Sequence, residues 1–305
     1  MDTCFEFNLD PTILHMGALQ LRYYGLIFAS MLYVGFLIWR VQMLRGGYAE
    51  DLADRFMLWG ILAVLIGSRL GHCFFYDPER YLNDPIQILQ FWKGGLASHG
   101  ATIGLVVAML IFSIKYKMRF LEVLDRFSMS SAVGAAAVRL GNFFNSEIVG
   151  RQTDLPWAVK FLRYDNNCRH PSQLYEFALG LFVLLSLYLA DRFAGKEKRP
   201  LGMMAGLFLV LYFTGRFFVE FVKEYQTDLQ QKEFLTMGQY LSIVPFTIGL
   251  GLLIWAFVKR IPTNEGQEER LARVTVQESA QKRTENSPAP KKPSRKNSKK
   301  KSKRK

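Results

Sequence analysis

The chain has few cysteines, three in 305 residues. Zinc and redox sites use cysteine pairs in CxxC spacing, and small disulfide-stabilised domains need a much higher cysteine density. Neither pattern occurs here, which argues against a zinc ribbon, a thioredoxin-like site and a disulfide scaffold. We therefore expect Cys4, Cys73 and Cys168 to be unpaired thiols.

Common signatures of cofactor and hydrolase chemistry are also missing. His72, His99 and His170 show neither HExxH spacing nor Cys/His ligand spacing. There is no nucleotide-binding loop, no GxSxG elbow and no internal repeat of the kind found in many transporters. We expect neither a metal nor an organic cofactor.

Charged residues are absent from several long stretches. The uncharged runs Tyr23–Trp39, Gly94–Ile114 and Phe234–Val258 are close to the roughly 20 apolar residues that cross a bilayer as a helix. Such runs exclude a soluble two-domain enzyme and a disordered protein. With turn-forming residues between them, they predict an all-α polytopic membrane protein with about seven transmembrane helices. The expected spans are about 20–40, 56–76, 96–114, 127–145, 172–190, 201–221 and 239–258.

The formal net charge of +13 belongs almost entirely to one end of the chain. Residues 259–305 hold 16 Lys or Arg and five Glu, without apolar periodicity. We therefore divide the chain into a membrane-embedded domain, 1–258, and a disordered basic cytoplasmic tail, 259–305. Beside a membrane such a tail is attracted to anionic headgroups, so we expect membrane lipids and no nucleic acid as its partner.

The short connections predict the orientation of the helices, because Lys and Arg concentrate in alternate segments. By the positive-inside rule the richer set and the tail are cytoplasmic, which puts the N-terminus outside. Segment 77–97 is amphipathic and is expected to lie along the outer interface. The richer set comprises 40–55, 115–126 and 191–200, and the other set comprises 1–22, 77–97, 146–171 and 223–238.

Six charged or histidine side chains interrupt the predicted spans, all in the outer half of the membrane. Singly, each has a structural explanation, because an Arg near a helix end reaches the headgroups and an Arg–Glu pair four residues apart stabilises its helix. A histidine in such a helix is more often a satisfied core residue than a catalyst. Embedded charge nevertheless costs roughly 2.5 kcal/mol or more per residue on insertion scales, and the inner half of these spans has no comparable residue. A one-sided layer therefore indicates a site. Its members are Arg69, His99, Arg139, Glu176, Arg216 and Glu220.

This layer contains more arginine than carboxylate. A guanidinium group binds two phosphate oxygens at once and cannot be deprotonated in proteins. At this depth the available phosphate is a phospholipid headgroup. Charge and topology alone predict a protein that handles phospholipid at the outer leaflet of a cytoplasmic membrane.

Closely spaced polar and glycine residues follow Val138, in the segment RLGNFFNSEIVGR at 139–151. This segment resembles the signature of the prolipoprotein diacylglyceryl transferase family, R-x-G-N-F-x-N-x-E-x-x-G. The resemblance covers about residues 15–258. It departs from the common family pattern at Val138, Ser146 and Ala101, which concerns local helix packing and no side chain with chemistry. Further matching segments are Tyr23–Gly25, Gly94–Gly95, Ser98–Gly100, His170–Glu176, Gly215–Phe217, Glu220–Phe221 and Met237–Gln239.

The resemblance implies an enzyme of the bacterial cytoplasmic (inner) membrane, with its active site toward the outer leaflet. It would transfer the diacylglyceryl group of phosphatidylglycerol to the lipobox cysteine thiol of a prolipoprotein. A thioether forms and glycerol phosphate leaves, as the first step of lipoprotein maturation. Its partners would be phosphatidylglycerol, the prolipoprotein signal peptide and membrane lipids.

The resemblance also implies catalytic roles. Arg139 would bind the phosphate of phosphatidylglycerol, and Arg216, held by Glu220, would bind the same or the departing phosphate. His99 is the candidate base for the substrate thiol, although cationic surroundings alone would also favour a thiolate. Substrate-binding roles follow for Tyr24, Arg69, Arg139, Asn142, Asn145, Glu147, Gly150, Tyr175 and Glu220, and for several of them helix-end capping is the alternative.

Two other functions remain open on the sequence. A transporter or flippase would bind the same headgroup through the same polar layer. Transport needs access from both sides of the membrane, however, and the inner half of the predicted spans lacks polar residues. A receptor or scaffold that uses the basic tail is the second alternative.

Overall fold

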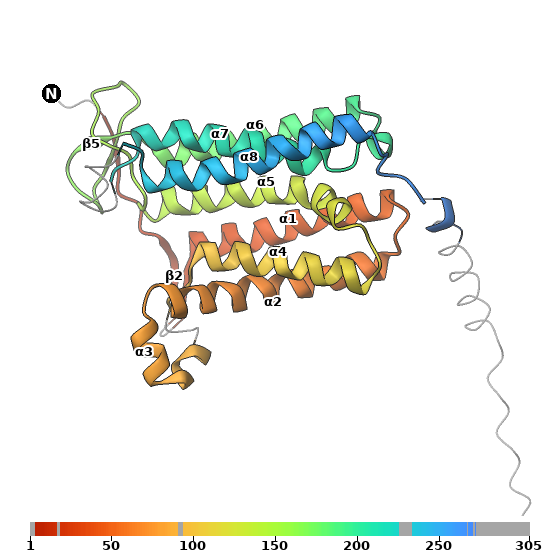
Figure 1. Cartoon of the computed structure of the whole chain (residues 1–305). Coiled ribbons are helices and arrows are strands. Elements are labelled where there is room, and N and C mark those ends of the chain that lie inside the picture. Colours follow the sequence, from red (N-terminus) through yellow and green to blue (C-terminus); the bar gives the residue numbers. More distant parts are fainter. Residues whose placement is uncertain are drawn as a thin grey trace, which may run out of the picture.

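Long helices dominate the computed structural model, which describes residues 4–16, 19–90, 94–225, 234–266, 268–270 and 272 (Figure 1). Each long helix coincides with one predicted span, so the expected all-α polytopic architecture is confirmed. The long helices are α1 (Tyr23–Arg45), α2 (Glu50–Phe75), α4 (Ser98–Lys115), α5 (Phe120–Phe144), α6 (Ser172–Phe193), α7 (Met203–Val219) and α8 (Met237–Lys259).

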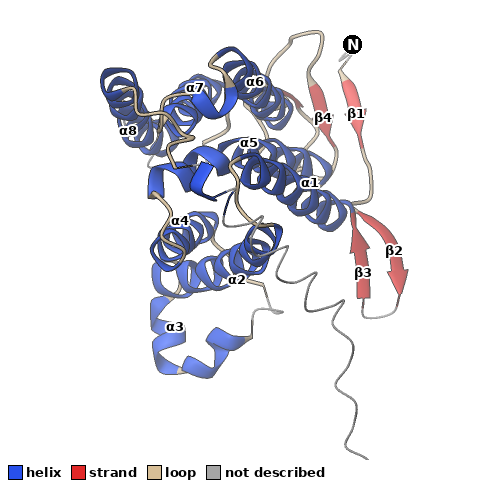
Figure 2. Ribbon diagram, turned by 90° about the vertical axis from the view of Figure 1, so that its right-hand side faces the viewer, coloured by secondary structure: helices blue, strands red, loops and turns tan. Residues whose placement is uncertain are grey.

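Six of these helices, all except α5, are long and apolar enough to cross a membrane among the described residues. Helix α5 is richer in Ser, Ala and Gly and carries Glu122, Asp125, Arg126 and Arg139. It lies in the middle of the bundle, next to α1, α6 and α7 (Figure 2). Because other helices surround it, α5 needs little apolar surface for lipid, and small residues let its neighbours approach closely.

Consecutive long helices run in opposite directions. Helices α4, α6 and α8 therefore begin at the end of the bundle where α2, α5 and α7 finish (Figure 1). Seen along the bundle, α6, α7 and α8 form one layer, α1 and α5 a second, and α2 and α4 a third (Figure 2). This topology brings late positions of α5 and α7 to the same level as early positions of α4 and α6.

Helices α2 and α4 pack through glycine. Gly67 and Gly71 on α2 face Gly100 and Gly104 on α4, and a Cβ added to Gly71 would lie 2.7 Å from the Cα of Gly100. Glycines four residues apart allow two helix backbones to approach this closely. Gly100 thus fixes the first turn of α4, which carries His99, against the end of α2.

Short strands, which the sequence did not predict, lie at the end of the bundle where α4, α6 and α8 begin (Figure 1). Strand β1 (Phe5–Phe7) pairs in parallel with β4 (Val159–Phe161), and β4 pairs antiparallel with β5 (Cys168–Arg169). A separate hairpin joins β2 (Thr12–Met16) to β3 (Leu19–Arg22) just before α1. Phe7, Val159 and Phe161 form a small apolar core with Phe143 at the end of α5, so the sheet sits on the signature helix.

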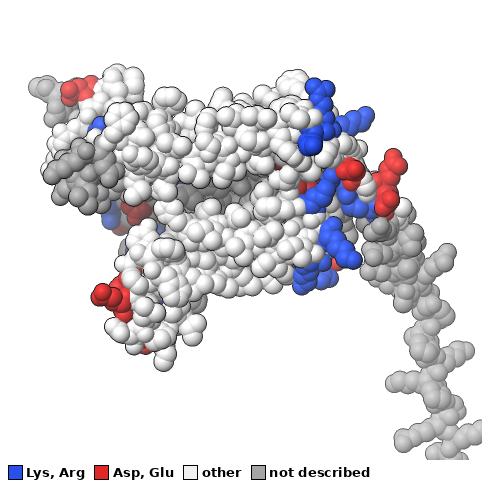
Figure 3. Space-filling view, in the orientation of Figure 1, with Lys and Arg blue, Asp and Glu red and all other residues white. Residues whose placement is uncertain are grey.

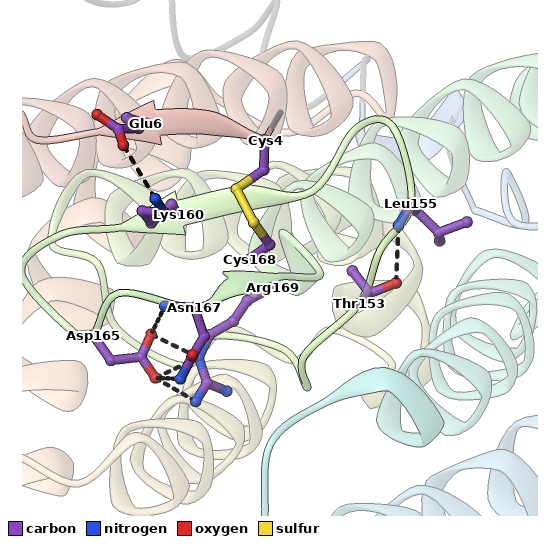
Figure 4. Close-up of a disulfide and its surroundings, with 9 residues drawn as sticks. All are labelled: Cys4, Glu6, Thr153, Leu155, Lys160, Asp165, Asn167, Cys168 and Arg169. Atoms are coloured by element: carbon purple, nitrogen blue, oxygen red, sulfur yellow. Dashed lines mark hydrogen bonds and ion pairs between the residues drawn. A yellow bond between two sulfur atoms is a disulfide. The ribbon is translucent and has the colours of Figure 1, made fainter. Parts of the chain in front are cut away.

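The expectation of three unpaired thiols was wrong for two of them. Cys4 and Cys168 form a disulfide across this small sheet (Figure 4). The pairing of β1 with β4 and of β4 with β5 brings the two Cα atoms to 6.0 Å although 164 positions separate them in sequence. Among the described residues Cys73 alone is a free thiol, and it is buried.

The connection between α2 and α4 projects from the bundle. It contains α3 (Pro78–Asn83) and the 3-10 helix η1 (Pro85–Leu89) (Figure 1). Leu82, Ile86 and Leu89 are 68%, 70% and 72% exposed. These apolar side chains suit a membrane interface, and the placement of 77–97 along it stays a prediction. Residues 91–93 of that segment lie outside the described residues.

The opposite end of the bundle contains buried ion pairs. Arg126 donates to Glu122 and Glu197 at 2.8 Å each, and Arg199 donates to Asp191 at 2.6 Å. Helix α5 begins at Phe120 and not at about 127, so the expectation that the inner half holds no charge was wrong. The charges are tolerated there because they are paired, Arg126 both with Glu122 four residues away and with the distant Glu197.

The chain beyond α8 continues along this end. Thr263 is fully buried, and its amide donates to the carbonyl oxygen of Arg199 at 3.0 Å. Packed structure thus extends past the Val258/Lys259 boundary expected from composition. Residues 273–305, most of the predicted disordered tail, lie outside the described residues.

Candidate active site

The candidate site is centred on Glu176, which is buried near the start of α6. Three cations surround its carboxylate. Arg139 Nε lies 3.0 Å from Oε2, while Arg216 Nη1 and Lys223 Nζ donate to Oε1 at 3.3 and 3.2 Å. They come from the end of α5, the end of α7 and the residues that follow the short helix η4 (Glu220–Val222). One carboxylate therefore holds three cations together.

Glu220 adds a second carboxylate but does not hold Arg216 as expected. It accepts from Lys223 Nζ at 3.3 Å, and its carboxylate lies against Gly238 at the start of α8, where a Cβ would overlap it. The structure pairs Arg216 with Glu176 instead. Counting Arg139, Arg216 and Lys223 against the two carboxylates, the cluster keeps one excess positive charge.

Lys223 is the member that sequence reasoning missed. It is 6% exposed, and burial lowers the pKa of its ammonium group, an effect that the nearby Glu176 opposes. Its position three residues after Glu220 is only a weak signal, because a lysine at the start of an outer loop is ordinarily exposed. Its main partner, Glu176, is 47 positions away.

The signature segment after Arg139 forms a polar turn beside this cluster. The side-chain amides of Asn142 and Asn145 donate to the Glu147 carboxylate at 3.2 and 3.3 Å. The Glu147 carbonyl oxygen in turn accepts from Gln173 Nε2 at 2.7 Å, which ties the turn to α6. The structure thus brings the three predicted polar residues of the signature together.

Close packing explains two glycines of the signature. The ring of Tyr24 lies on Gly141, where a Cβ would be 2.6 Å from Tyr24 Cδ2. The Gly150 amide donates to the His170 carbonyl oxygen at 3.0 Å, and a Cβ there would collide with His170 and Val222. Gly150 thus lies beside Lys223, with which it forms a β-bridge, and Tyr24 packs on the signature helix, while the substrate-binding roles of both residues stay predictions.

Tyr175 lies next to the buried Glu176 and is part of an aromatic group. Its hydroxyl accepts from Trp157 Nε1 at 2.8 Å and lies 3.2 Å from His170 Nδ1. These residues, with Leu155, Phe218 and others, line an apolar pocket of about 510 Å³. The cluster thus has an apolar cavity beside it.

Arg69 does not join the cluster. Its guanidinium donates to the carbonyl oxygens of Gln87, Ile88 and Gly94 at 2.5, 2.9 and 2.6 Å, and to that of Gly95 at 3.2 Å. All three guanidinium nitrogens are used in this way. Arg69 therefore fixes the segment that leads into α4.

His99 lies exposed on the first turn of α4. Within the described chain its side chain has no hydrogen bond or ion pair, and α4 packs mainly on α2. His99 thus shares the end of the bundle with the Glu176 cluster without touching it (Figure 1). Figure 3 shows a hollow between the α7–α8 side and the α2–α4 side of the molecule, and Figure 2 shows α5 between these two sides.

Known proteins were compared with this chain. A model of the family described as prolipoprotein diacylglyceryl transferase matches residues 11–255. Three relatives bear the name phosphatidylglycerol–prolipoprotein diacylglyceryl transferase. That of Nitrosomonas europaea is 38% identical over 87% of this chain and 95% of its own length. Those of Cupriavidus necator and Bacteroides fragilis are 39% and 38% identical over 82% and 80% of this chain, and 93% and 91% of their own lengths.

These matches agree with the motif resemblance and extend over nearly the whole described bundle. The chain therefore belongs to the prolipoprotein diacylglyceryl transferase family.

Proposed function

We propose that this chain transfers the diacylglyceryl group of phosphatidylglycerol to the lipobox cysteine of a prolipoprotein. The substrate sulfur forms a bond to the glycerol carbon, and the bond from that carbon to the phosphate oxygen breaks. Glycerol phosphate leaves with the bonding electrons, and the thiol proton goes to a base. The observation that carries the proposal is the cluster of three cations around buried Glu176, at the end of the signature helix.

The cluster suits a leaving phosphate. Arg139 turns Nε and Arg216 turns Nη1 toward Glu176, and the other nitrogens of the two guanidinium groups are the proposed donors to phosphate oxygens. Negative charge grows on that phosphate during the reaction, and donors already fixed in place stabilise it without reorganising. Glu176 and Lys223 act as positioning residues, because they hold both guanidinium groups in a single arrangement.

His99 is the proposed base, and Arg69 is its positioning residue. Arg69 binds the carbonyl oxygens just before α4 and so fixes the turn that carries His99. The hollow in Figure 3 separates the α4 side from the α7–α8 side. The lipid phosphate would bind at the Glu176 cluster, and the peptide thiol would lie toward α4. The bound substrates would therefore reach from one side of the hollow to the other.

The outer leaflet of the cytoplasmic membrane is the proposed location. Lys and Arg gather at the end of the bundle opposite the cluster (Figure 3), as expected for a cytoplasmic face. The Cys4–Cys168 disulfide belongs to the cluster's end, which suits an oxidising compartment. The N-terminus would then be outside and the residues after α8 inside.

The test uses pure protein in vesicles that contain phosphatidylglycerol, with a peptide carrying a lipobox cysteine. Mass spectrometry should show the peptide gaining one diacylglyceryl group, and a peptide with serine in place of that cysteine should gain none. Movement of labelled phosphatidylglycerol between leaflets without any peptide adduct would overturn the proposal in favour of a lipid transporter.

A further inference from the structure

A second polar pocket lies at the end of the bundle opposite the Glu176 cluster. It has a volume of about 270 Å³. Its walls are the α1–α2 turn with Tyr48, the α4–α5 turn with Lys117 and Arg119, and the segment after α8 with Glu265 and Arg270. The proposed transfer reaction uses none of these residues.

The segment after α8 is anchored where it forms one wall of the pocket. The Asn264 amide donates to the Glu197 carbonyl oxygen at 2.8 Å, and Arg270 Nε donates to that of Gly46 at 3.1 Å. The Arg270 guanidinium also lies 4.6 Å from the centre of the Tyr48 ring. The pocket is therefore a built feature with a fixed cation in its wall.

The charges that line the pocket do not balance. Glu265 accepts a hydrogen bond from Arg119 at 2.7 Å, and Glu122 accepts two hydrogen bonds from Arg126. Arg270 Nη2 is buried without a hydrogen bond, 3.6 Å from Glu122. Lys117 is exposed and makes no ion pair with any described residue. The lining residues supply three cations, Lys117, Arg119 and Arg270, against the two carboxylates of Glu122 and Glu265, so the pocket keeps one excess positive charge.

We propose that this pocket binds a phosphate group through Lys117 and Arg270. The Arg270 guanidinium nitrogen that makes no hydrogen bond and the Lys117 ammonium group, which lines the same pocket, are charged donors of the kind that bind phosphate oxygens. The phosphate belongs either to a lipid headgroup at this face of the membrane or to a soluble phosphoryl compound. The site is independent of the transferase proposal, because it lies at the other end of the bundle.

The experiment places the full chain in phosphatidylcholine nanodiscs with and without phosphatidic acid. Native mass spectrometry measures retained phosphatidic acid, and a thermal unfolding series with inorganic phosphate in pure phosphatidylcholine measures binding of the free anion. The double variant Lys117→Gln/Arg270→Gln is compared with Lys198→Gln/Lys259→Gln, which removes two exposed cations that do not line the pocket.

The pocket variant should bind its phosphate ligand about tenfold more weakly than the unchanged chain, and the control variant should bind as the unchanged chain does. If the pocket variant retains less phosphatidic acid than the unchanged chain, the phosphate belongs to a lipid headgroup. If phosphatidic acid is not retained and only the stabilisation by inorganic phosphate is weakened, the phosphate belongs to a soluble compound. Equal losses in both variants, or no loss in either series, would overturn the proposal. Unchanged peptide modification by the pocket variant would show that it is folded.

Discussion

Glu176 has the most demanding environment of any side chain in the candidate site. Its carboxylate is buried among Arg139, Arg216 and Lys223, each contributed by a different segment. A buried charge is tolerated only when it is paired, and removal of one partner leaves the others uncompensated. Glu176 is therefore both a structural residue and the residue that orders the proposed phosphate donors.

We predict that Glu176→Gln destabilises the protein by about 3–5 kcal/mol, because the buried Lys223 and the half-buried Arg139 and Arg216 lose their common counter-charge. Thermal unfolding in detergent measures the change. The matched control is Glu6→Gln, which removes an exposed partner of Lys160 and should cost about 1 kcal/mol or less. Equal effects of the two substitutions would contradict the role of Glu176.

Arg139→Lys tests the guanidinium geometry. Lysine keeps the charge near Glu176 but loses the planar fork, so turnover should fall about 10²–10³-fold while the unfolding temperature changes little. Arg22→Lys, at an exposed site beside Gln20, is the control and should leave turnover unchanged. Near-normal turnover of the Arg139 variant would remove Arg139 from phosphate binding.

His99→Asn tests the base. If His99 accepts the thiol proton, turnover should fall about 10²–10⁴-fold, because the thiol loses its base. Turnover of both proteins with the lipobox peptide measures this, with His15→Asn on the exposed β2 strand as control. Retained activity of the His99 variant would favour thiolate formation by the arginines alone.

At the scale of elements, the disulfide joins β1 to the sheet that rests on the end of α5. A bridge between distant positions restricts the unfolded chain, so its loss should cost about 2–4 kcal/mol. The unchanged protein should therefore unfold at a lower temperature in the presence of a reductant. The unfolding temperature of the Cys4→Ser/Cys168→Ser variant should not depend on the reductant. If the unfolding temperature of the unchanged protein did not depend on it either, the disulfide would be contradicted.

The segment after α8 gives a second test at this scale. Truncation after Ala272 leaves Thr263 and Arg270 in place and should preserve both peptide modification and the unfolding temperature. Truncation after Pro262 removes the buried Thr263 and the Arg270 contacts with Gly46 and Tyr48, so the unfolding temperature should fall. Equal unfolding temperatures of the two truncations would mean that this segment contributes nothing to stability.

At the scale of the whole molecule, the apolar runs were enough to predict the seven long helices, because lipid-facing helices need continuous apolar surface. Helix α5 shows the limit of that reasoning. Its first turns hold Glu122 and Arg126, which the sequence pattern assigns to a loop, whereas Arg126 donates to both Glu122 and Glu197 inside the bundle. Charge inside a bundle depends on partners that a single segment does not reveal.

The candidate site, too, was predictable from the sequence only in part. The signature predicted Arg139, Asn142, Asn145 and Glu147 as neighbours, since they lie on one helix end. Lys223 was missed because its partner Glu176 comes from another helix, and Arg69 was expected to meet a phosphate although it binds carbonyl oxygens. The strands and the disulfide were missed because β1 and β4 are short and more than 150 residues apart.

In the proposed reaction of the whole molecule, phosphatidylglycerol loses its diacylglyceryl group to a cysteine sulfur. The most direct measurement follows both products in one vesicle sample, the modified lipobox peptide by mass and the released glycerol phosphate by quantitative assay. The account predicts that the two appear in equal amounts and that both disappear when the peptide cysteine is replaced by serine. Release of glycerol phosphate without peptide modification, or neither product from folded protein, would contradict it.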